Sequence, residues 1–315
     1  MIKPAKDPPI SPYFVLAAGI LAVSGGSIFA RLAQAEDVPS LVIAAYRTAV
    51  ATLLLLPFML ARHRAEVRGM KAADWRLALI AGAALAVHFG TWISSLSYTS
   101  VAASTVLVST SPLWVAVAAP FFLGEPFTRP LKVGMFLALV GTVIISLGTM
   151  VGMENGRFLL NIVDLAGGQR PLLGNTLALI GSLAGAVYIL IGRRLRDGLS
   201  LVSYATLVYG TAAVCLIAAV LVSGEPLFGY SPPVYLLLLL AGIVPQLIGH
   251  SSFNYALGYL PAAYVGVTIF AEPIAASFLA LLIFSERPGP LVIFGSIFVL
   301  VGVLISTRKG GPGSS

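Results

Sequence analysis

The sequence repeats itself at a fixed distance, and this feature constrains the fold more than any other. Pro112, Glu125, Gly134 and Gly141 each have an identical residue 161 positions later, Glu286 being the counterpart of Glu125. The shift continues through neighbouring apolar positions, and towards the start of the chain it drifts by only one residue. Agreement over most of a chain indicates two homologous halves.

The repeat divides the chain into two halves and a connection. We assign residues 1–150 to the first repeat, 151–171 to an external linker and 172–309 to the second repeat. Residues 310–315, Gly-Gly-Pro-Gly-Ser-Ser, have the composition of a tag remnant, and we leave them out of the fold prediction. The linker carries an apolar patch at 158–163, which we expect to lie on a membrane surface.

The composition is that of a membrane protein. With 58% hydrophobic and only 10% charged residues, the chain has too little polar surface to cover a soluble globule. Continuous apolar runs without strict alternation exclude a porin-like barrel and predict helices that cross a hydrocarbon core of about 30 Å. We expect ten such helices, at about 13–30, 40–60, 76–97, 103–123, 131–150, 172–192, 201–222, 234–257, 262–284 and 290–307.

The positive charges predict the orientation of these helices. If the amino terminus lies inside, the inner loops collect most of the lysines and arginines, and the outer loops keep only Arg31, Arg157, Arg170 and Arg287. This asymmetry predicts both termini in the cytoplasm, and it explains the net charge of +7 without a nucleic-acid partner. Because each half holds five helices, the second half must enter the membrane upside down. The predicted fold is an all-α integral membrane protein with ten transmembrane helices in two inverted five-helix repeats.

A polar stripe in the eighth apolar stretch marks a candidate site, because polar groups inside a membrane need partners or water. Gln246, His250 and Asn254 are spaced four apart, which predicts that they share one face of a helix. Such a stripe lines a substrate site or makes hydrogen bonds to a neighbouring helix.

A second polar stripe lies at nearly the corresponding point of the first repeat. His88, Trp92 and Ser95 share one face of the third stretch. We expect His88 and His250 to approach each other from the two halves and to bind substrate, with Trp92 and Tyr188 as aromatic lining. The alternative is that these groups only bridge helices. Two dispersed histidines without a carboxylate pair do not predict a metal site.

Glu272 is the acidic residue expected well inside a helix, directly before Pro273. A carboxyl group there would carry a coupling proton or pair with a buried arginine. Proline removes a backbone donor and kinks a helix, so Pro273 and its counterpart Pro112 predict matching kinks in the ninth and fourth helices. These kinks would serve as gating joints, unless they are only packing features.

Arg47 lies about two turns into the second stretch, where an unpaired charge costs about 2.5 to 3.5 kcal/mol. It therefore needs a partner or a route to water. It would contact a carboxylate or phosphate of a substrate through its planar guanidinium. The alternative is that the side chain extends to the outer interface and anchors the helix.

Two repeated features indicate shared architecture rather than transport. Glu125 and Glu286 stand at helix ends, where the dipole of the fifth or tenth helix would favour a negative charge. Each glutamate is followed by two glycines spaced seven apart, which share one face of the next helix. Small residues on one face predict close packing of backbones.

The repeated motifs resemble those of the drug/metabolite transporter superfamily, in particular ten-helix bacterial permeases with two EamA-type repeats. The resemblance covers nearly the whole chain and rests on Arg47, on Tyr98, Pro112, Glu125, Gly134 and Gly141, and on Tyr259, Pro273, Glu286, Gly295 and Gly302. It implies a basket of helices in the bacterial inner membrane. The third, fourth, eighth and ninth helices would surround a central cavity, and the fifth and tenth would form a flank.

Inverted repeats favour a secondary transporter, because two similar halves can open a shared site first to one side and then to the other. We expect export of small metabolites or amphipathic compounds such as amino acids, by a monomer or weak homodimer, with protons as the candidate coupling ion. The alternatives are an intramembrane enzyme or lipid-modifying protein that uses His88, His250 and Glu272, and a scaffold without transport. The sequence has no nucleotide-binding loop or nucleophile–base set, so we expect no cofactor.

Overall fold

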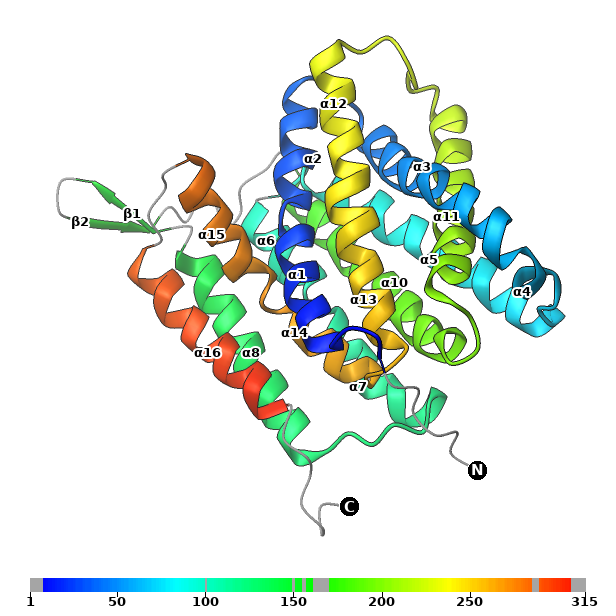
Figure 1. Cartoon of the computed structure of the whole chain (residues 1–315). Coiled ribbons are helices and arrows are strands. Elements are labelled where there is room, and N and C mark those ends of the chain that lie inside the picture. The colour runs from blue at the N-terminus through cyan, green and yellow to red at the C-terminus, as the bar shows by residue number, and fades with distance from the viewer. Residues whose placement is uncertain are drawn as a thin grey trace.

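The computed structural model is a bundle of helices, and it describes residues 8–99, 101–148, 151–154, 157–160, 170–284 and 289–306 (Figure 1). In chain order the helices are α1 (Pro12–Ser24), α2 (Gly26–Ala35), α3 (Ser40–Phe58), the π-helix η1 (Met59–His63), α4 (Arg64–Arg68), α5 (Ala72–Ser95), α6 (Val101–Val108), α7 (Ser111–Phe122), α8 (Arg129–Gly148), α10 (Pro171–Arg196), α11 (Leu201–Ser223), α12 (Pro232–Ala241), the π-helix η2 (Gly242–His250), α13 (Ser251–Leu257), α14 (Ala262–Ile269), α15 (Glu272–Phe284) and α16 (Pro290–Ser306). Among the described residues, 8 helical stretches are long and apolar enough to cross a membrane, and α16 is a shorter apolar helix.

Apolar composition and clear end signals explain why these segments are helical. Inside lipid every backbone N–H and C=O group must be paired within the segment, and a helix achieves this. α10 and α12 both begin with proline, which has no N–H group to leave unpaired in a first turn. Ser200 caps α11 by accepting from the Ser203 N–H group, and Gly224 ends α11 in a left-handed conformation with φ of 70°.

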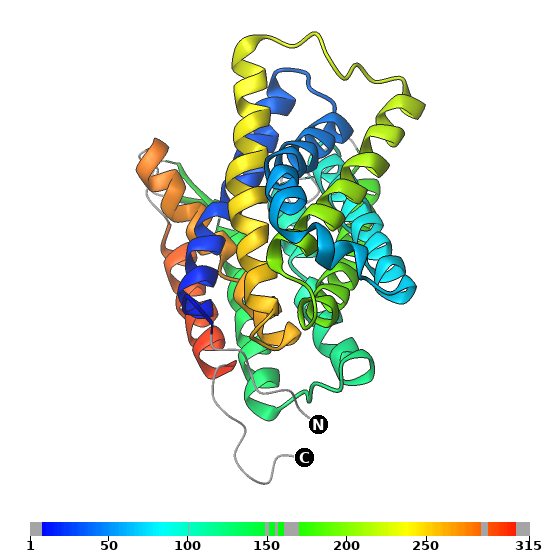
Figure 2. The ribbon, with the colours of Figure 1, turned by 45° about the vertical axis from the view of Figure 1, so that its right-hand side comes forward.

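The first helix begins and the last helix ends at the same end of the bundle, which we call the terminal end (Figures 1 and 2). The chain before α1 is held there by Tyr255 of α13, whose hydroxyl donates to the Ile10 carbonyl at 2.8 Å and accepts from the Ile10 N–H group at 3.1 Å. The last turn of α10 also reaches this end, because Arg193 donates to the Leu257 carbonyl at 3.2 Å.

Two helical spans are broken at matching positions of the repeat. The fourth span divides into α6 and α7, and the ninth divides into α14 and α15. α7 begins at Ser111 and α15 at Glu272, which lie 161 residues apart, and a proline follows in each case. The structure thus interrupts the α-helix directly before both predicted positions, by a two-residue turn at 109–110 and another at 270–271.

Three other departures from regular helix were not predicted. The first span is interrupted at Gly25, between α1 and α2, and the second continues from α3 into the π-helix η1. The eighth span contains the nine-residue π-helix η2. Pro245 lies inside η2 and has no N–H group to donate to the preceding turn. Gln246 and His250 lie in this segment, so the α-helical face assumed for them does not describe their arrangement. π-helical turns are frequent at functional sites.

The described part of the linker forms a short antiparallel hairpin of β1 (Val151–Glu154) and β2 (Arg157–Leu160). Val151 pairs with Leu160, and Glu154 pairs with Arg157. The sequence predicted no strands here. The remainder of the expected apolar patch, residues 161–163, lies outside the described residues.

α8 and α16 lie side by side and form a flank of the bundle (Figure 1). Their backbones are in contact: a Cβ added at Gly134 would lie 2.4 Å from the Gly302 carbonyl oxygen, and one at Gly141 would lie 2.5 Å from the Gly295 carbonyl oxygen. Real Cβ atoms do not approach an oxygen this closely, so glycine lets the two helices meet. The close packing predicted for the glycine faces is confirmed.

Replacing Gly141 with alanine should loosen this flank. The added methyl group meets backbone atoms of α16, so the helices must move apart at a cost of about 1–3 kcal/mol. Thermal unfolding in detergent should give a lower Tm for Gly141→Ala than for the wild type. Gly289→Ala is the matched control, because none of the described residues lies within 4 Å of a Cβ at that position. An equal loss in both variants would contradict the packing argument.

Candidate functional site

Arg47 of α3 is the most deeply buried charged side chain in the described ranges, with 2% of its surface exposed. Its Nε atom donates to Oε1 of Gln246 on η2 at 2.9 Å, and its guanidinium carbon lies 4.2 Å from the centre of the Phe89 ring. A hydrogen bond and a cation–π contact both stabilise a charge away from water. The interpretation that Arg47 extends to the outer interface is therefore wrong, because the guanidinium lies inside the bundle between the two halves.

The two predicted histidines meet from opposite halves, as expected. The ring centres of His88 on α5 and His250 on η2 lie 6.4 Å apart, and Trp92 stacks on His88 at 6.2 Å. His88 Nδ1 lies 2.8 Å from the Gly181 carbonyl oxygen on α10. Because a carbonyl oxygen only accepts, Nδ1 carries the proton of this hydrogen bond. A neutral His88 therefore presents an unprotonated Nε2 atom.

Tyr188 and Asn254 are joined directly. The Tyr188 hydroxyl donates to Asn254 Oδ1 at 2.6 Å, and Asn254 Nδ2 donates to the Tyr209 hydroxyl at 3.0 Å. These bonds link α10, α11 and α13. The Tyr188 ring also lies 6.2 Å from the His250 ring, so the hydrogen-bonded side chains hold Tyr188 beside that imidazole.

Ser95 has a different environment from the other residues of its predicted stripe. Its hydroxyl donates to the Trp92 carbonyl at 2.6 Å and accepts from the Ser104 hydroxyl of α6 at 2.6 Å. The structure thus joins Ser95 to a contact between α5 and α6. Its role in substrate binding stays a prediction.

Three buried polar atoms close to these groups have no hydrogen-bond partner among the described residues: Trp92 Nε1, Gln246 Nε2 and His250 Nδ1. Buried polar atoms in proteins are nearly always paired, so such a concentration calls for an explanation. We name Arg47, His88, Trp92, Gln246 and His250 the central cluster. It combines a cation, two imidazoles and free hydrogen-bonding atoms from both halves, which is chemistry suited to a small polar ligand.

Glu272 is the first residue of α15, and the prediction that it lies in the middle of a helix is wrong. It interacts electrostatically with Arg47 and makes no ion pair with the described residues. A negative charge in a first helical turn is favoured by the helix dipole. Pro273, the next residue, is buried. Pro112 packs against Gly266 of α14, where an added Cβ would lie 3.4 Å from the Pro112 Cα atom.

A second group of polar residues lies at the terminal end, where Arg193 donates to the Leu257 carbonyl. Arg193 of α10 donates to Glu125 Oε1 at 2.7 Å and to Asp197 Oδ1 at 2.9 Å. The other oxygen of Glu125 accepts from the N–H group of Ala262, the first residue of α14, at 2.8 Å. We call Glu125, Arg193, Asp197 and Ala262 the terminal network, and it ties the connection between α7 and α8 to α10 and α14.

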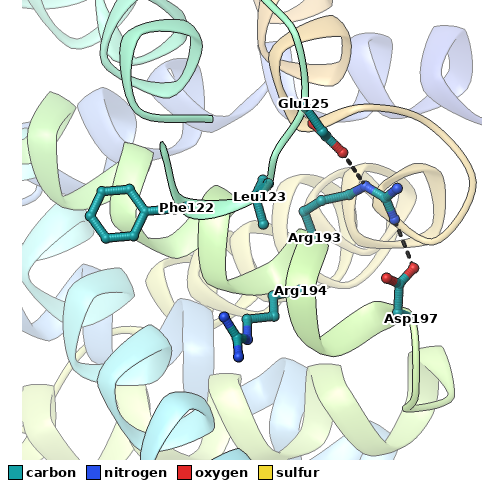
Figure 3. A pocket seen from close by; sticks show the side chains of 6 residues that line it. All are labelled: Phe122, Leu123, Glu125, Arg193, Arg194 and Asp197. Carbon is teal, nitrogen blue, oxygen red and sulfur yellow. Dashed lines mark hydrogen bonds and ion pairs between the residues drawn. The ribbon is translucent and has the colours of Figure 1, made fainter. Parts of the chain in front are cut away.

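The terminal network borders a pocket of about 180 Å³, which is also lined by Phe122, Leu123 and Arg194 (Figure 3). The carboxylate of Glu125 caps α14, a helix of the second half, and not only the helix that follows it in the chain. Glu286, the counterpart of Glu125 in the repeat, lies outside the described residues.

Comparison with known proteins identifies the family. The profile of the EamA-like transporter family matches the chain twice, at residues 10–147 and 172–308. The chain belongs to the EamA-like transporter family. An uncharacterized transporter of Archaeoglobus fulgidus is 25% identical over 305 residues, which are 94% of this chain and 97% of that protein. A probable terminal-alkyne amino-acid exporter of Streptantibioticus cattleyicolor is 24% identical over 213 residues, 65% of this chain and 64% of that protein.

The fold is shared with a protein of known crystal structure, at 18% sequence identity and a TM-score of 0.74, over 94% of this chain and 96% of that chain. The EamA-like family and these relatives are named as transporters and not as enzymes. The protein is therefore a multi-pass membrane transporter with a small-molecule substrate. Within the described ranges no group of three or more His, Cys, Asp or Glu residues is placed to hold a metal ion.

Sequence reasoning missed several residues that shape the site of this EamA-like protein. Phe89 supports Arg47 but carries no polar signal, and Pro245 was not connected with a π-helix. Arg193 is one of the positive charges assigned to the inner loops, and no partner was predicted for it. Its partner Glu125 lies 68 residues away, and no spacing along the chain relates the two.

The ion pair of the terminal network should stabilise the folded protein modestly. Glu125 and Arg193 are partly exposed, and such pairs contribute about 0.2–1 kcal/mol. A double-mutant cycle of Glu125→Gln and Arg193→Gln, followed by thermal unfolding in detergent, should give a coupling in this range. Asp197→Asn is the control, because Asp197 is 71% exposed and should couple less strongly to Arg193. A coupling of zero for Glu125 would contradict the assignment.

Proposed function

We propose that this EamA-like protein is a secondary transporter that exports small metabolites or amphipathic compounds such as amino acids by alternating access. The observation that carries the proposal is the pair of broken helices, at positions 161 residues apart. Discontinuous helices at a repeat interface are a recurring way in which secondary transporters build a substrate site. Each break lies close to the central cluster: Ser111 and His88 both border Gly185, and Glu272 interacts with Arg47.

The proposed transporter has ten helical spans in two inverted repeats. Residues 1–150 form the first repeat and residues 172–309 the second, and a linker joins them. The two separate family matches support this division. The direction of the helices supports the inversion: α1 begins at the terminal end, whereas its counterpart α10 finishes there. The ten spans are the eight long apolar stretches together with α8 and α16.

The substrate would bind at the central cluster, where both halves contribute side chains. Arg47, His88 and Trp92 come from the first half and Gln246 and His250 from the second. Tyr188 and Asn254 form the adjoining wall, and Ser95 remains a candidate of the same site. The rings suit an amphipathic solute. The exporter name of the Streptantibioticus cattleyicolor relative supports amino acids and the export direction.

For the substrate site to open towards the terminal end, the hydrogen bonds and ion pairs of the terminal network must break. Its bonds join the first half, through Glu125, to α10 and α14 of the second half. The breaks preceding Pro112 and Pro273 supply the joints about which the half-helices move. We propose that both termini lie on the cytoplasmic side of the bacterial inner membrane, so that the terminal network would close the site towards the cytoplasm. We expect a monomer or weak homodimer.

Solute counterflow tests transport directly. Proteoliposomes loaded with an unlabelled amino acid should accumulate the same labelled amino acid transiently, and protein-free vesicles should not. Arg47→Gln should abolish this exchange while the purified variant still elutes as a folded protein. Screening amino acids, nucleosides, vitamins and quaternary amines covers the proposed solutes. Product formation without movement across the membrane would instead favour the intramembrane enzyme built on His88, His250 and Glu272.

Glu272 is the proposed proton-coupling group, because its carboxyl group lies beside the break and interacts with Arg47. Glu272→Gln keeps the shape of the side chain but cannot release a proton. We expect it to abolish solute accumulation driven by a pH gradient and to retain counterflow. Glu36→Gln, the same change at an exposed position outside both groups of residues, should retain both. Full pH-driven accumulation in Glu272→Gln would show that another group couples transport to protons.

A further inference from the structure

Arg47 has donors left over after its contacts within the bundle. Among the described residues its guanidinium makes one hydrogen bond, from Nε to Gln246 Oε1. Both terminal nitrogens therefore keep N–H groups for another partner. Nη1 lies beside Gly26 of α2, where an added Cβ would approach it to 3.0 Å. A planar guanidinium with a free edge matches two oxygens of one planar group.

Two of the three free atoms in the central cluster are also donors. Because Oε1 of Gln246 accepts from Arg47, the orientation of this amide is set, and Nε2 remains as a buried donor without a described partner. Trp92 Nε1 is likewise buried and unpartnered, and the centre of its ring lies 5.9 Å from the Arg47 guanidinium carbon. Neither of these N–H groups can accept a hydrogen bond, so a ligand that satisfies them must bring acceptors.

The shape of the free edge of Arg47 favours one kind of acceptor. The two terminal nitrogens of a planar guanidinium match the two oxygens of a singly charged, planar carboxylate. The neighbouring walls are aromatic, with Phe89 at 5.0 Å and Phe253 at 5.8 Å from the His250 ring centre. These rings suit an apolar group attached to the carboxylate.

We propose that Arg47, Gln246 and Trp92 form a carboxylate-binding subsite, so that the substrate is a carboxylate-bearing solute whose apolar group packs against Phe89 and His250. This inference rests on the proposed function, because it names the substrate class of the same site. It assigns Gln246 Nε2 and Trp92 Nε1 as specificity-determining donors beside the cation.

A matched series of ligands tests the subsite without requiring transport. The purified full-length protein is titrated in detergent with L-phenylalanine, 3-phenylpropionate, L-phenylalaninamide and phenethylamine, and the Tm is recorded. A ligand that binds the native state raises the Tm. The two carboxylates should raise it, whereas the amide and the amine should need at least about tenfold higher concentrations for the same shift.

Gln246→Glu tests whether Gln246 Nε2 donates to the carboxylate of the ligand. The new carboxylate keeps the side-chain shape, pairs with Arg47 and removes the Nε2 donor, so carboxylate ligands should lose at least about tenfold in apparent affinity. Asn175→Asp makes the same chemical change on α10, where Oδ1 accepts from the Thr99 hydroxyl and can continue to do so. This control should leave the ligand-induced shifts unchanged.

Three results would overturn the subsite: equal shifts from phenylalanine and its amide, no shift from either carboxylate, or undiminished carboxylate shifts in Gln246→Glu. Counterflow of the amine or the amide would support the transport proposal and contradict only the proposal that the substrate needs a carboxylate. A carboxylate-dependent shift that is lost in Gln246→Glu, without counterflow of either carboxylate, would support the subsite and count against transport.

Discussion

The buried guanidinium of Arg47 is the constraint on which the centre of the bundle depends. A charge in an apolar interior is tolerated only with partners, and Arg47 has an amide and an aromatic ring. The amide belongs to Gln246 on η2, in the other half of the chain. The same hydrogen bond therefore compensates the charge of Arg47 and joins the two halves. The π-helical backbone of η2 carries both Gln246 and His250, so its geometry decides what surrounds the cation.

Features that depend on local patterns could be predicted from the sequence. Apolar runs of sufficient length indicated the helices, because backbone groups in lipid must be paired internally. The repeated prolines indicated the breaks before Pro112 and Pro273. The meeting of His88 with His250 could be expected because the two lie at nearly corresponding points of the repeats.

Partners that come together only in three dimensions could not be predicted. Arg47 clearly needed a partner, yet nothing along the chain pointed to Gln246 rather than to an acidic residue. Glu125 stood ahead of one helix in sequence and caps another in space, through the Ala262 N–H group. The orientation of Ser95 towards Ser104 depends on how α6 packs against α5. Each of these outcomes is decided by packing between helices, which periodicity does not encode.

The contact between α8 and α16, which we call the seam, is reciprocal with respect to the repeat. Gly134 meets Gly302, which is the repeat counterpart of Gly141, and Gly141 meets Gly295, the counterpart of Gly134. Identical subunits related by a two-fold axis make contacts of this kind, in which each surface is its own complement. A single unduplicated copy of the repeat would already carry both sides of the seam. Fusing two genes of that size would then preserve an older dimer rather than require a new interface.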